Sequence, residues 1–447
     1  MTKGFTASLV GMMVDEGRLN FTTQVQEIFP EFRRDDAQAN ITIADLLSHR
    51  TGLAAYDGMW PSSDNKILLG RSEAIPILSY VPAARLLRSD FIYNNIAYEV
   101  VGQILEKVSG QSYLELLHER IIRPLNLNRT FYAEEAFDEN TAKSYAALSN
   151  RSVYEIPTWG HGKDLLIGAA GAIRSSMPHL LNGQIGVPNK SLREYSYAMG
   201  WIRTQLPAVV DLFADYAPPV LGHGSPSRLM IHHQGNIPGN VGYVALFPET
   251  TTAVVVLGNS AGLTDTMRLL GQILVETVFE TDVNSTLYLE TARSASSNNI
   301  RFVAKVRQDL INGKTMQTPQ RPLSAYVGRY YNSIGNFFIE INDVGDRLQV
   351  AYMGADHGTF DLEPYQTDSF FWWLDFDESA KRARLPGYPK EYFILRFGCS
   401  SAASFWHVGG DVEMGCVTWK HGFGVPGEGE IFRKVERNPW DRLTELK

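Results

Sequence analysis

The chain has 447 residues and a formal net charge of −8 at pH 7, which are values of a globular protein long enough for two domains. The modest negative charge, without any basic stripe, argues against nucleic acid as the main partner. No run of about 18 apolar residues occurs, so we expect no membrane span. The N-terminus lacks the pattern of a secretory signal, so the chain as written is expected in the cytoplasm, with secretion left open.

Helical spacing of apolar residues predicts several helices in the first part of the chain. The run from Phe5 to Val14 is mostly apolar and stops before Gly17, which is typical of a buried helix closed by a glycine. A second strong pattern begins just after Asn94 and stops at Gly110. We expect helices over residues 1–16, 41–53, 94–108, 112–122 and 263–280.

Strand-rich runs begin near residue 225. "NVGYVALFPE" and "TTAVVVLGN" are separated by only a few residues around 248–250. This predicts an antiparallel hairpin, because a parallel pair needs a crossover of about a dozen residues. From residue 321 the sequence contains only short strand and turn patterns, which indicates an antiparallel barrel or sandwich. The predicted class is α+β, with a domain over 1–290, a connector over 291–320 and a β-domain over 321–447.

The chain has two cysteines, Cys399 and Cys416. Two cysteines are too few for a disulfide framework or a zinc cage. They could pair across neighbouring strands, but we favour free buried thiols. No metal ligand pattern is present, and we expect neither a metal nor another cofactor.

Four pieces of sequence carry chemistry-bearing residues. Lys3 lies in the first turn of the N-terminal helix in "MTKGFT", and "ITIADLLSHRTGL" follows at 41–53. Tyr93 opens "YNN" ahead of a helix, and His233 stands in "HHQGNIPG" at a strand edge. In this order, and with "GAAGAIRSS" at 168–176, they resemble the serine β-lactamase and penicillin-binding-protein superfamily, especially its class C-like branch. That family reads Ser-x-x-Lys, Tyr-x-Asn and then Lys-Thr-Gly or His-x-Gly.

The resemblance implies a fold and a missing residue. It implies an antiparallel sheet flanked by helices, a helical lobe and a C-terminal β-domain like that of some members. The first two strands of the sheet would lie upstream of Met1, so that residues 251–258 form an exposed edge strand, apolar on both faces. "MTKGFT" matches x-x-Lys-x-Phe-Thr, so the nucleophilic serine would directly precede Met1. We favour a truncated gene model over a true pseudoenzyme.

The resemblance also assigns catalytic roles. Lys3 would be the base for the serine, since residues three apart share a helix face and a desolvated lysine loses its proton more easily. Tyr93 would share this proton transfer, taking the proton on attack and returning it to the leaving group. Asn95 would hydrogen-bond the substrate.

The third motif would bind the reacting group. The strand from His233 through Gly235 would place the backbone N–H of Asn236 in the oxyanion hole, together with the N–H of the serine. Many relatives have lysine at the position of His233, and a histidine is a weaker, pH-dependent anchor for a carboxylate. We therefore expect small-molecule esters or amides, or carrier-bound acyl groups, as substrates. Hydrolysis versus acyl transfer, and the oligomeric state, stay open.

Each of these residues also has a structural interpretation. Taken alone, Lys3 is most often a solvated surface residue, and Tyr93 is a capping or packing residue. Asn95 is a helix N-cap candidate, His233 belongs to a strand, and Gly235 is a turn glycine. A chain that keeps the cleft without its nucleophile would be a non-catalytic binding protein.

A different hydrolase motif occurs at residues 258–262, where "GNSAG" follows an apolar strand. It fits the nucleophile elbow of α/β-hydrolases with Ser260 as nucleophile, and Asp375 or Asp377 and then His407 follow in the right order. We disfavour this esterase hypothesis. An elbow strand belongs to a parallel sheet, whereas this strand is the second arm of the predicted hairpin.

A second Ser-x-x-Lys pattern occurs in "PSSDNK", where Ser63 precedes Lys66 by three residues. The pattern lies in a predicted loop. It also follows the "SHRTGL" stretch, whereas the family has its first motif upstream of that signature. We therefore do not assign it to the site.

Overall fold

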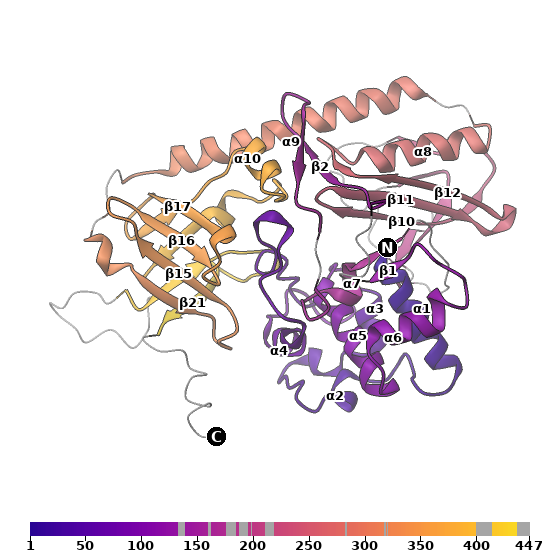
Figure 1. The fold of residues 1–447 in the computed structure, drawn as a ribbon, viewed down its shortest axis with the longest axis horizontal. Coiled ribbons are helices and arrows are strands. Elements are labelled where there is room, and N and C mark those ends of the chain that lie inside the picture. Colours follow the sequence, from indigo (N-terminus) through magenta and orange to yellow (C-terminus); the bar gives the residue numbers. More distant parts are fainter. Residues whose placement is uncertain are drawn as a thin grey trace. The chain divides into compact units, whose positions relative to one another are not determined.

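The computed structural model describes residues 1–132, 139–159, 162–175, 185–186, 195–197, 199–210, 219–281, 284–316, 319, 321–398 and 414–435. The chain divides into two compact units, and Figure 1 labels many of their helices and strands. Unit 1 comprises Met1–Ala55 and Gly70–Ile300, and unit 2 comprises Tyr56–Leu69 and Arg301–Lys447. None of the helices within the described ranges is both long and apolar enough to cross a membrane.

The two strongest helix predictions are confirmed. Helix α1 (Thr2–Asp15) is followed by Gly17 at φ +71°, and helix α5 (Asn95–Ser109) by Gly110 at φ +77°. In α5 the Asn94 side chain accepts a hydrogen bond from the N–H of Ala97, which satisfies one donor of the first turn. Asn94, not the expected Asn95, is therefore the N-cap.

The helix expected over 41–53 is shorter than predicted. Helix α3 (Ile43–Leu47) starts at a capping box between Thr42 and Asp45. It ends before His49, whose left-handed φ of +58° is incompatible with a right-handed helix. The remaining "HRTGL" residues form a loop.

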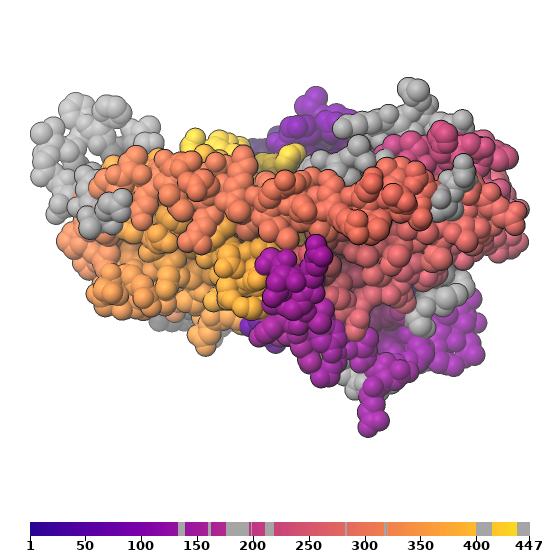
Figure 2. Space-filling model, turned by 90° about the horizontal axis from the view of Figure 1, so that it is seen from above, coloured from indigo at the N-terminus to yellow at the C-terminus, as the bar shows by residue number. Residues whose placement is uncertain are grey.

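The other helical elements of unit 1 are mostly short. They are α2 (Val25–Ile28), η1 (Ala37–Asn40), η3 (Arg71–Glu73), α4 (Ala74–Tyr80), α6 (Tyr113–Leu117), the π-helical turn η4 (His118–Ile122), α7 (Gly168–Gly171), η5 (Pro248–Thr250) and α8 (Thr266–Val278). The long helix α9 (Ser285–Gly313) begins in unit 1 and ends in unit 2. Figure 2 shows α9 on the surface, in keeping with its exposed Leu289 and Phe302.

Unit 1 contains a six-stranded sheet in the order β12-β11-β10-β7-β6-β5, and its neighbouring strands are antiparallel. The predicted hairpin is confirmed, with Val244 of β11 opposite Val255 of β12. The sheet strands are β5 (Ile185–Gly186), β6 (Tyr195–Tyr197), β7 (Ile202–Leu206), β10 (Arg228–Ile237), β11 (Asn240–Phe247) and β12 (Thr252–Gly258). Smaller sheets contain β1 (Phe131–Tyr132), β2 (Ser144–Ala147), β3 (Val153–Ile156), β4 (Ile173–Arg174), β8 (Ala208–Val209), β9 (Val220–Leu221) and β13 (Ser260–Ala261).

Strand β12 ends this sheet within the described residues, as the sequence predicts. Its one fully buried side chain, Val254, belongs to the core between the sheet and α8. Leu257 on the same strand is 51% exposed, and Leu270, Leu274 and Val278 of α8 are 43–48% exposed. An edge with unpaired backbone groups and apolar neighbours is a template for pairing with another chain.

We expect this edge to make the chain self-associate. The variant Leu257→Lys should shift the molar mass measured by multi-angle light scattering toward the monomer, because a charge on an edge strand opposes strand pairing. Leu385→Lys is the control, since Leu385 is equally exposed but lies in unit 2. A monomeric parent chain, or an equal shift by both variants, would contradict the interpretation.

Unit 2 contains a closed antiparallel barrel, which resolves the predicted choice between barrel and sandwich. Its strands are β14 (Gly328–Tyr331), β15 (Phe338–Asp343), β16 (Leu348–Tyr352), β17 (Thr359–Pro364), β18 (Ser369–Phe371), β19 (Ile394–Phe397), β20 (Cys416–Trp419) and β21 (Glu430–Lys434). Short helical elements are η2 (Ser63–Asn65), η6 (Leu323–Ala325), η7 (Asp356–Gly358), α10 (Phe376–Lys381) and η8 (Lys390–Phe393). Cys416 is disulfide-bonded, so the expectation of free thiols is wrong; Cys399 lies outside the described residues.

The segment Tyr56–Leu69 packs within unit 2, although it lies far from the barrel in the sequence. The Ser62 hydroxyl lies 3.0 Å from Nδ1 of His357, and the Tyr392 hydroxyl donates to the carbonyl of Gly58. A Cβ on Gly58 would lie 1.5 Å from the carbonyl oxygen of His421, so only glycine permits this approach. Sequence patterns do not indicate this long-range pairing.

Candidate active site

Lys3 is buried, with 3% of its surface exposed. Its ammonium donates to Oδ1 of Asn95 at 2.7 Å and to the carbonyl of Ala170 at 3.1 Å. The same nitrogen lies 4.6 Å from the ring centre of Tyr93 and 5.3 Å from that of Tyr98, so aromatic faces add to its stabilisation. Lys3 is therefore not the solvated surface lysine of the structural interpretation. It is a buried cation that the fold supplies with hydrogen-bond acceptors and aromatic rings.

Close backbone contacts hold the start of α1 in place. Gly200 has φ +91°, and a Cβ there would lie 2.7 Å from the carbonyl oxygen of Lys3. On strand β10, a Cβ at Gly235 would lie 3.9 Å from the backbone nitrogen of Met1. The first turn of α1 thus lies against the strand that carries the third motif, and a larger residue at Gly200 would push the helix away.

The Tyr93–Asn95 turn presents alternate side chains to different surroundings. Asn94 is fully buried and serves as the cap of α5, whereas Tyr93 and Asn95 are half-buried. Asn95 contacts the Lys3 ammonium directly, and the Tyr93 ring lies beside it. The structure brings these three predicted site residues together.

His233 lies on β10 and is 5% exposed. Its Nδ1 is bonded to the carbonyl of Gln234, which leaves Nε2 to accept from the Tyr197 hydroxyl at 3.4 Å. Burial lowers the pKa of His233 well below its usual range, and the nearby positive charges, including the Lys3 ammonium, lower it further. His233 is therefore a neutral hydrogen-bonding group at pH 7.

Asn236 lies two residues beyond Gln234 on the same strand, opposite Val241 of β11. Its side chain is exposed, in contrast to the buried His233. Gly235 stands between the two motif residues and borders Met1. Asn236 is thus the residue of the third motif whose side chain reaches solvent.

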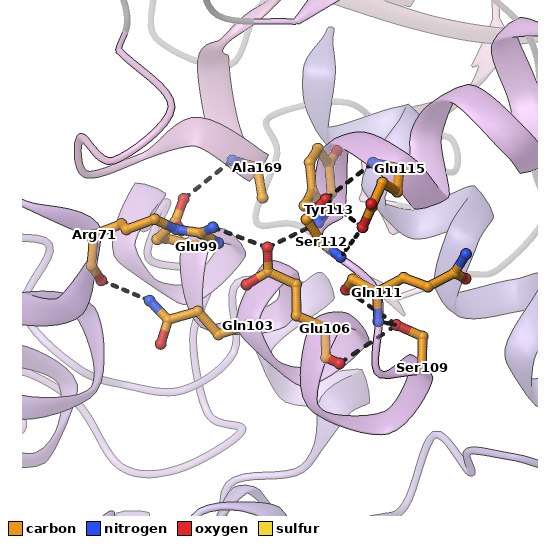
Figure 3. A network of polar contacts seen from close by, with 10 residues as sticks. All are labelled: Arg71, Glu99, Gln103, Glu106, Ser109, Gln111, Ser112, Tyr113, Glu115 and Ala169. Carbon is orange, nitrogen blue, oxygen red and sulfur yellow. Dashed lines mark hydrogen bonds and ion pairs between the residues drawn. The ribbon is translucent and has the colours of Figure 1, made fainter.

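A second layer of contacts fixes α7, the turn that supplies the Ala170 carbonyl to Lys3. Figure 3 shows the part of this layer around Arg71, Glu99 and Ala169. Glu99 of α5 is fully buried and accepts hydrogen bonds from Arg71 and from the backbone N–H of Ala169, both at 3.0 Å. Arg71 also pairs with Glu106 at 2.9 Å. The Thr6 hydroxyl on α1 donates to the Ala169 carbonyl at 2.6 Å. Turn α7 is therefore held from α5 on one side and from α1 on the other.

Burial raises the pKa of Glu99 from 4.5 to about 7, against the opposing effect of the Arg71 guanidinium. A carboxyl whose pKa is higher in the folded chain contributes stability that is present below pH 4.5 and is lost as the pH rises through 7. The difference corresponds to about 3 kcal/mol.

We therefore expect the parent to lose free energy of unfolding relative to the variant Glu99→Gln as the pH rises from 4.5 to about 7, because only the parent carries this carboxyl. Urea denaturation at several pH values measures the effect. Glu106→Gln is the matched control, because Glu106 belongs to the same network but its side chain is 24% exposed. If Glu99→Gln keeps the parent slope, the buried carboxyl does not titrate as described.

The other two hydrolase-like motifs, at residues 258–262 and 61–66, do not contribute to the site around Lys3. Ser260 lies in the short strand β13, directly after β12, and β12 pairs antiparallel with β11, whereas a nucleophile elbow follows a strand of a parallel sheet. Asp375 caps α10 in unit 2 and Asp377 lies within that helix, while His407 lies outside the described residues. Ser63 belongs to the turn η2 of unit 2, and Lys66 is exposed.

Sequence reasoning missed three contributors: the imidazole of His49, the ring of Tyr197 and the carbonyl of Ala170. His49 and Ala170 lie inside the "SHRTGL" and "GAAGAIRSS" stretches, so the motifs marked the right segments without indicating their roles. Tyr197 lies in "YSYAMGW". Across the ranges that the structure describes, no group of three or more His, Cys, Asp or Glu residues is arranged to hold a metal ion.

Comparison with known proteins defines the class. The Beta-lactamase family model matches residues 1–278, and a domain of unknown function (DUF3471) matches residues 313–386. The chain has the fold of β-lactamases and transpeptidases, with an added eight-stranded barrel. It belongs to the Beta-lactamase family, within the superfamily of serine β-lactamases and penicillin-binding proteins.

Individual relatives are distant. The unguisins hydrolase ungD of Aspergillus violaceofuscus is 26% identical over 412 residues, covering 80% of this chain and 71% of that protein. Penicillin-binding protein 4 of Amycolatopsis lactamdurans is 27% identical over 302 residues, covering 61% of this chain and 75% of that protein. Among solved structures, the octameric penicillin-binding protein homologue from Pyrococcus abyssi aligns with a TM-score of 0.49 and 20% identity, covering 84% of this chain and 81% of that one.

Proposed function

We propose that the chain is the main part of a serine-type hydrolase or acyltransferase that works through an acyl-enzyme, with its nucleophilic serine directly before Met1. The observation that supports this most is the buried Lys3 ammonium, held by Asn95 and Ala170 beside the Tyr93 ring. Burying a cation is costly, and an ordinary helix would keep it in water. A purely structural lysine does not account for Tyr93 and Asn95 at the same point.

The proposed chemistry follows from the placement of these groups. The serine oxygen attacks the acyl carbon of the substrate, and its proton passes to the Lys3–Tyr93 pair, which takes it in the form that lacks one proton, either amine with phenol or ammonium with phenolate. The developing oxyanion accepts from backbone N–H groups, with Asn236 and the serine as donors. The pair then returns the proton to the leaving alcohol or amine. Water or another acceptor finally takes the acyl group from the serine and frees it.

The substrate class follows from charge. Neutral His233 offers a hydrogen bond but no permanent cation, so the site does not select substrates by a carboxylate. Esters, amides and carrier-bound acyl groups fit this description. The names of relatives agree with amide or ester cleavage, since they include an unguisins hydrolase and a teichoic acid D-alanine hydrolase.

One experiment tests this proposal against its two alternatives. The chain is expressed with the genomic codons upstream of Met1, including a serine at the preceding position, and is treated with a fluorophosphonate probe. We expect labelling of that serine, and loss of labelling in the serine-to-alanine variant. Labelling at Ser260 would support the α/β-hydrolase hypothesis. A folded, extended chain that takes up no label would support the non-catalytic binding protein.

Two substitutions test the roles within the site. Lys3→Met keeps an unbranched side chain that is one atom shorter and lacks the amine, and Tyr93→Phe keeps the ring without the hydroxyl. Each should lower the labelling rate of the extended chain about 10²- to 10⁴-fold, the range of general acid–base catalysis. Ser260→Ala is the control and should leave the rate unchanged. Rates within threefold of the parent for both variants would remove Lys3 and Tyr93 from the mechanism.

A further inference from the structure

His49 has no role in the chemistry above, yet it lies in the centre of the site's aromatic cluster. It is fully buried, and its ring packs 4.3 Å from Tyr93, 4.9 Å from Tyr197 and 5.1 Å from Tyr98, measured between ring centres. Its backbone adopts a left-handed φ of +58°, which is uncommon for any residue other than glycine, although histidine, asparagine and aspartate adopt it more often than the rest. A residue kept in such a conformation needs an explanation.

Two hydrogen bonds join His49 to the turn that carries Tyr93. The His49 carbonyl accepts from the N–H of Ile92 at 2.9 Å, and its Nδ1 accepts from the N–H of Asn94 at 3.1 Å. These bonds flank Tyr93 on both sides. Because Nδ1 is an acceptor, the imidazole proton is on Nε2, which has no hydrogen-bond partner among the described residues.

The remaining contacts of this loop strengthen the same attachment. The carbonyl of Arg50 accepts from the N–H of Arg88, and the Asn94 side chain donates to the carbonyl of Ala54. Residues on both sides of His49 therefore hold the segment that leads into the turn. The left-handed backbone of His49 lets its carbonyl and its ring reach the same short stretch.

We propose that His49 is a positioning residue for Tyr93: it fixes the Ile92–Asn94 backbone so that the Tyr93 side chain stays beside the Lys3 ammonium. This inference rests on the proposed function for its catalytic consequence, while the clamp itself is a property of the fold. Asparagine is the variant that preserves the clamp. Its Oδ1 replaces Nδ1 as acceptor, and it tolerates the left-handed backbone.

Amide hydrogen exchange tests the clamp in the chain as it exists. His49→Gln, whose amide lies one methylene further out, and His49→Phe, which has no acceptor, should accelerate exchange of the Asn94 amide about tenfold or more. His49→Asn should stay close to the parent. Ser48→Ala is the control, because it removes the hydrogen bond from the Ser48 hydroxyl to the Ala44 carbonyl of α3, next to His49, without touching the turn. Equal exchange in the Gln, Phe and Asn variants would overturn the proposal.

A double-mutant cycle in the serine-extended chain tests the catalytic consequence. His49→Gln should lower the rate of acylation about 10- to 100-fold, with little change in the apparent binding constant of the probe. The separate variant His49→Asn should keep the parent's rate of acylation. In the Tyr93→Phe background the same substitution should have no further effect, because His49 acts through Tyr93. A loss of equal size in both backgrounds would overturn the proposal. An extended parent that is folded but never acylated would instead reject the proposed function, and the exchange result would still decide the clamp.

Discussion

The burial of the Lys3 ammonium is the constraint on which the site depends. A charge removed from water must find partners, and here they come from two separate parts of the chain. Residues 93–98 supply the Asn95 side chain and the rings of Tyr93 and Tyr98, and α7 supplies the Ala170 carbonyl. Each partner is held by further bonds, from Asn94 as cap to Glu99 beneath α7. The order around the site follows from the requirement to satisfy one buried cation.

The fold explains how such distant residues meet. The start of α1 lies against β10 at Gly235 and against the loop at Gly200, so that helix and sheet meet where the motifs lie. The helical lobe contributes its own loop, "SHRTGL", which joins the Tyr93 turn through His49. Most of these contacts use backbone groups, which tolerate changes of side chain nearby.

Sequence patterns predicted the elements that depend on interactions between residues close in sequence. The apolar spacing of α1 and α5, their glycine ends and the β11–β12 hairpin all depend on residues close in sequence, and all were predictable. The helix over 41–53 was predicted too long, because a histidine in the sequence does not by itself indicate the left-handed backbone that His49 adopts after α3. The membership of Tyr56–Leu69 in the barrel unit and the hydrogen bond from Lys3 to the Ala170 carbonyl depend on tertiary contacts, which the periodicity of a sequence does not indicate. Only the resemblance to a known family indicated that Lys3, Tyr93 and His233 belong together.

The most direct test of this account is a crystal structure of the serine-extended chain after reaction with a phosphonate. The account predicts phosphorus bonded to the oxygen of the serine before Met1. It also predicts the amine of Lys3 within about 2.6–3.2 Å of that oxygen and the phosphoryl oxygen facing the N–H of Asn236. Phosphorus on any other residue, or a Lys3 side chain turned away from the modified serine, would contradict it.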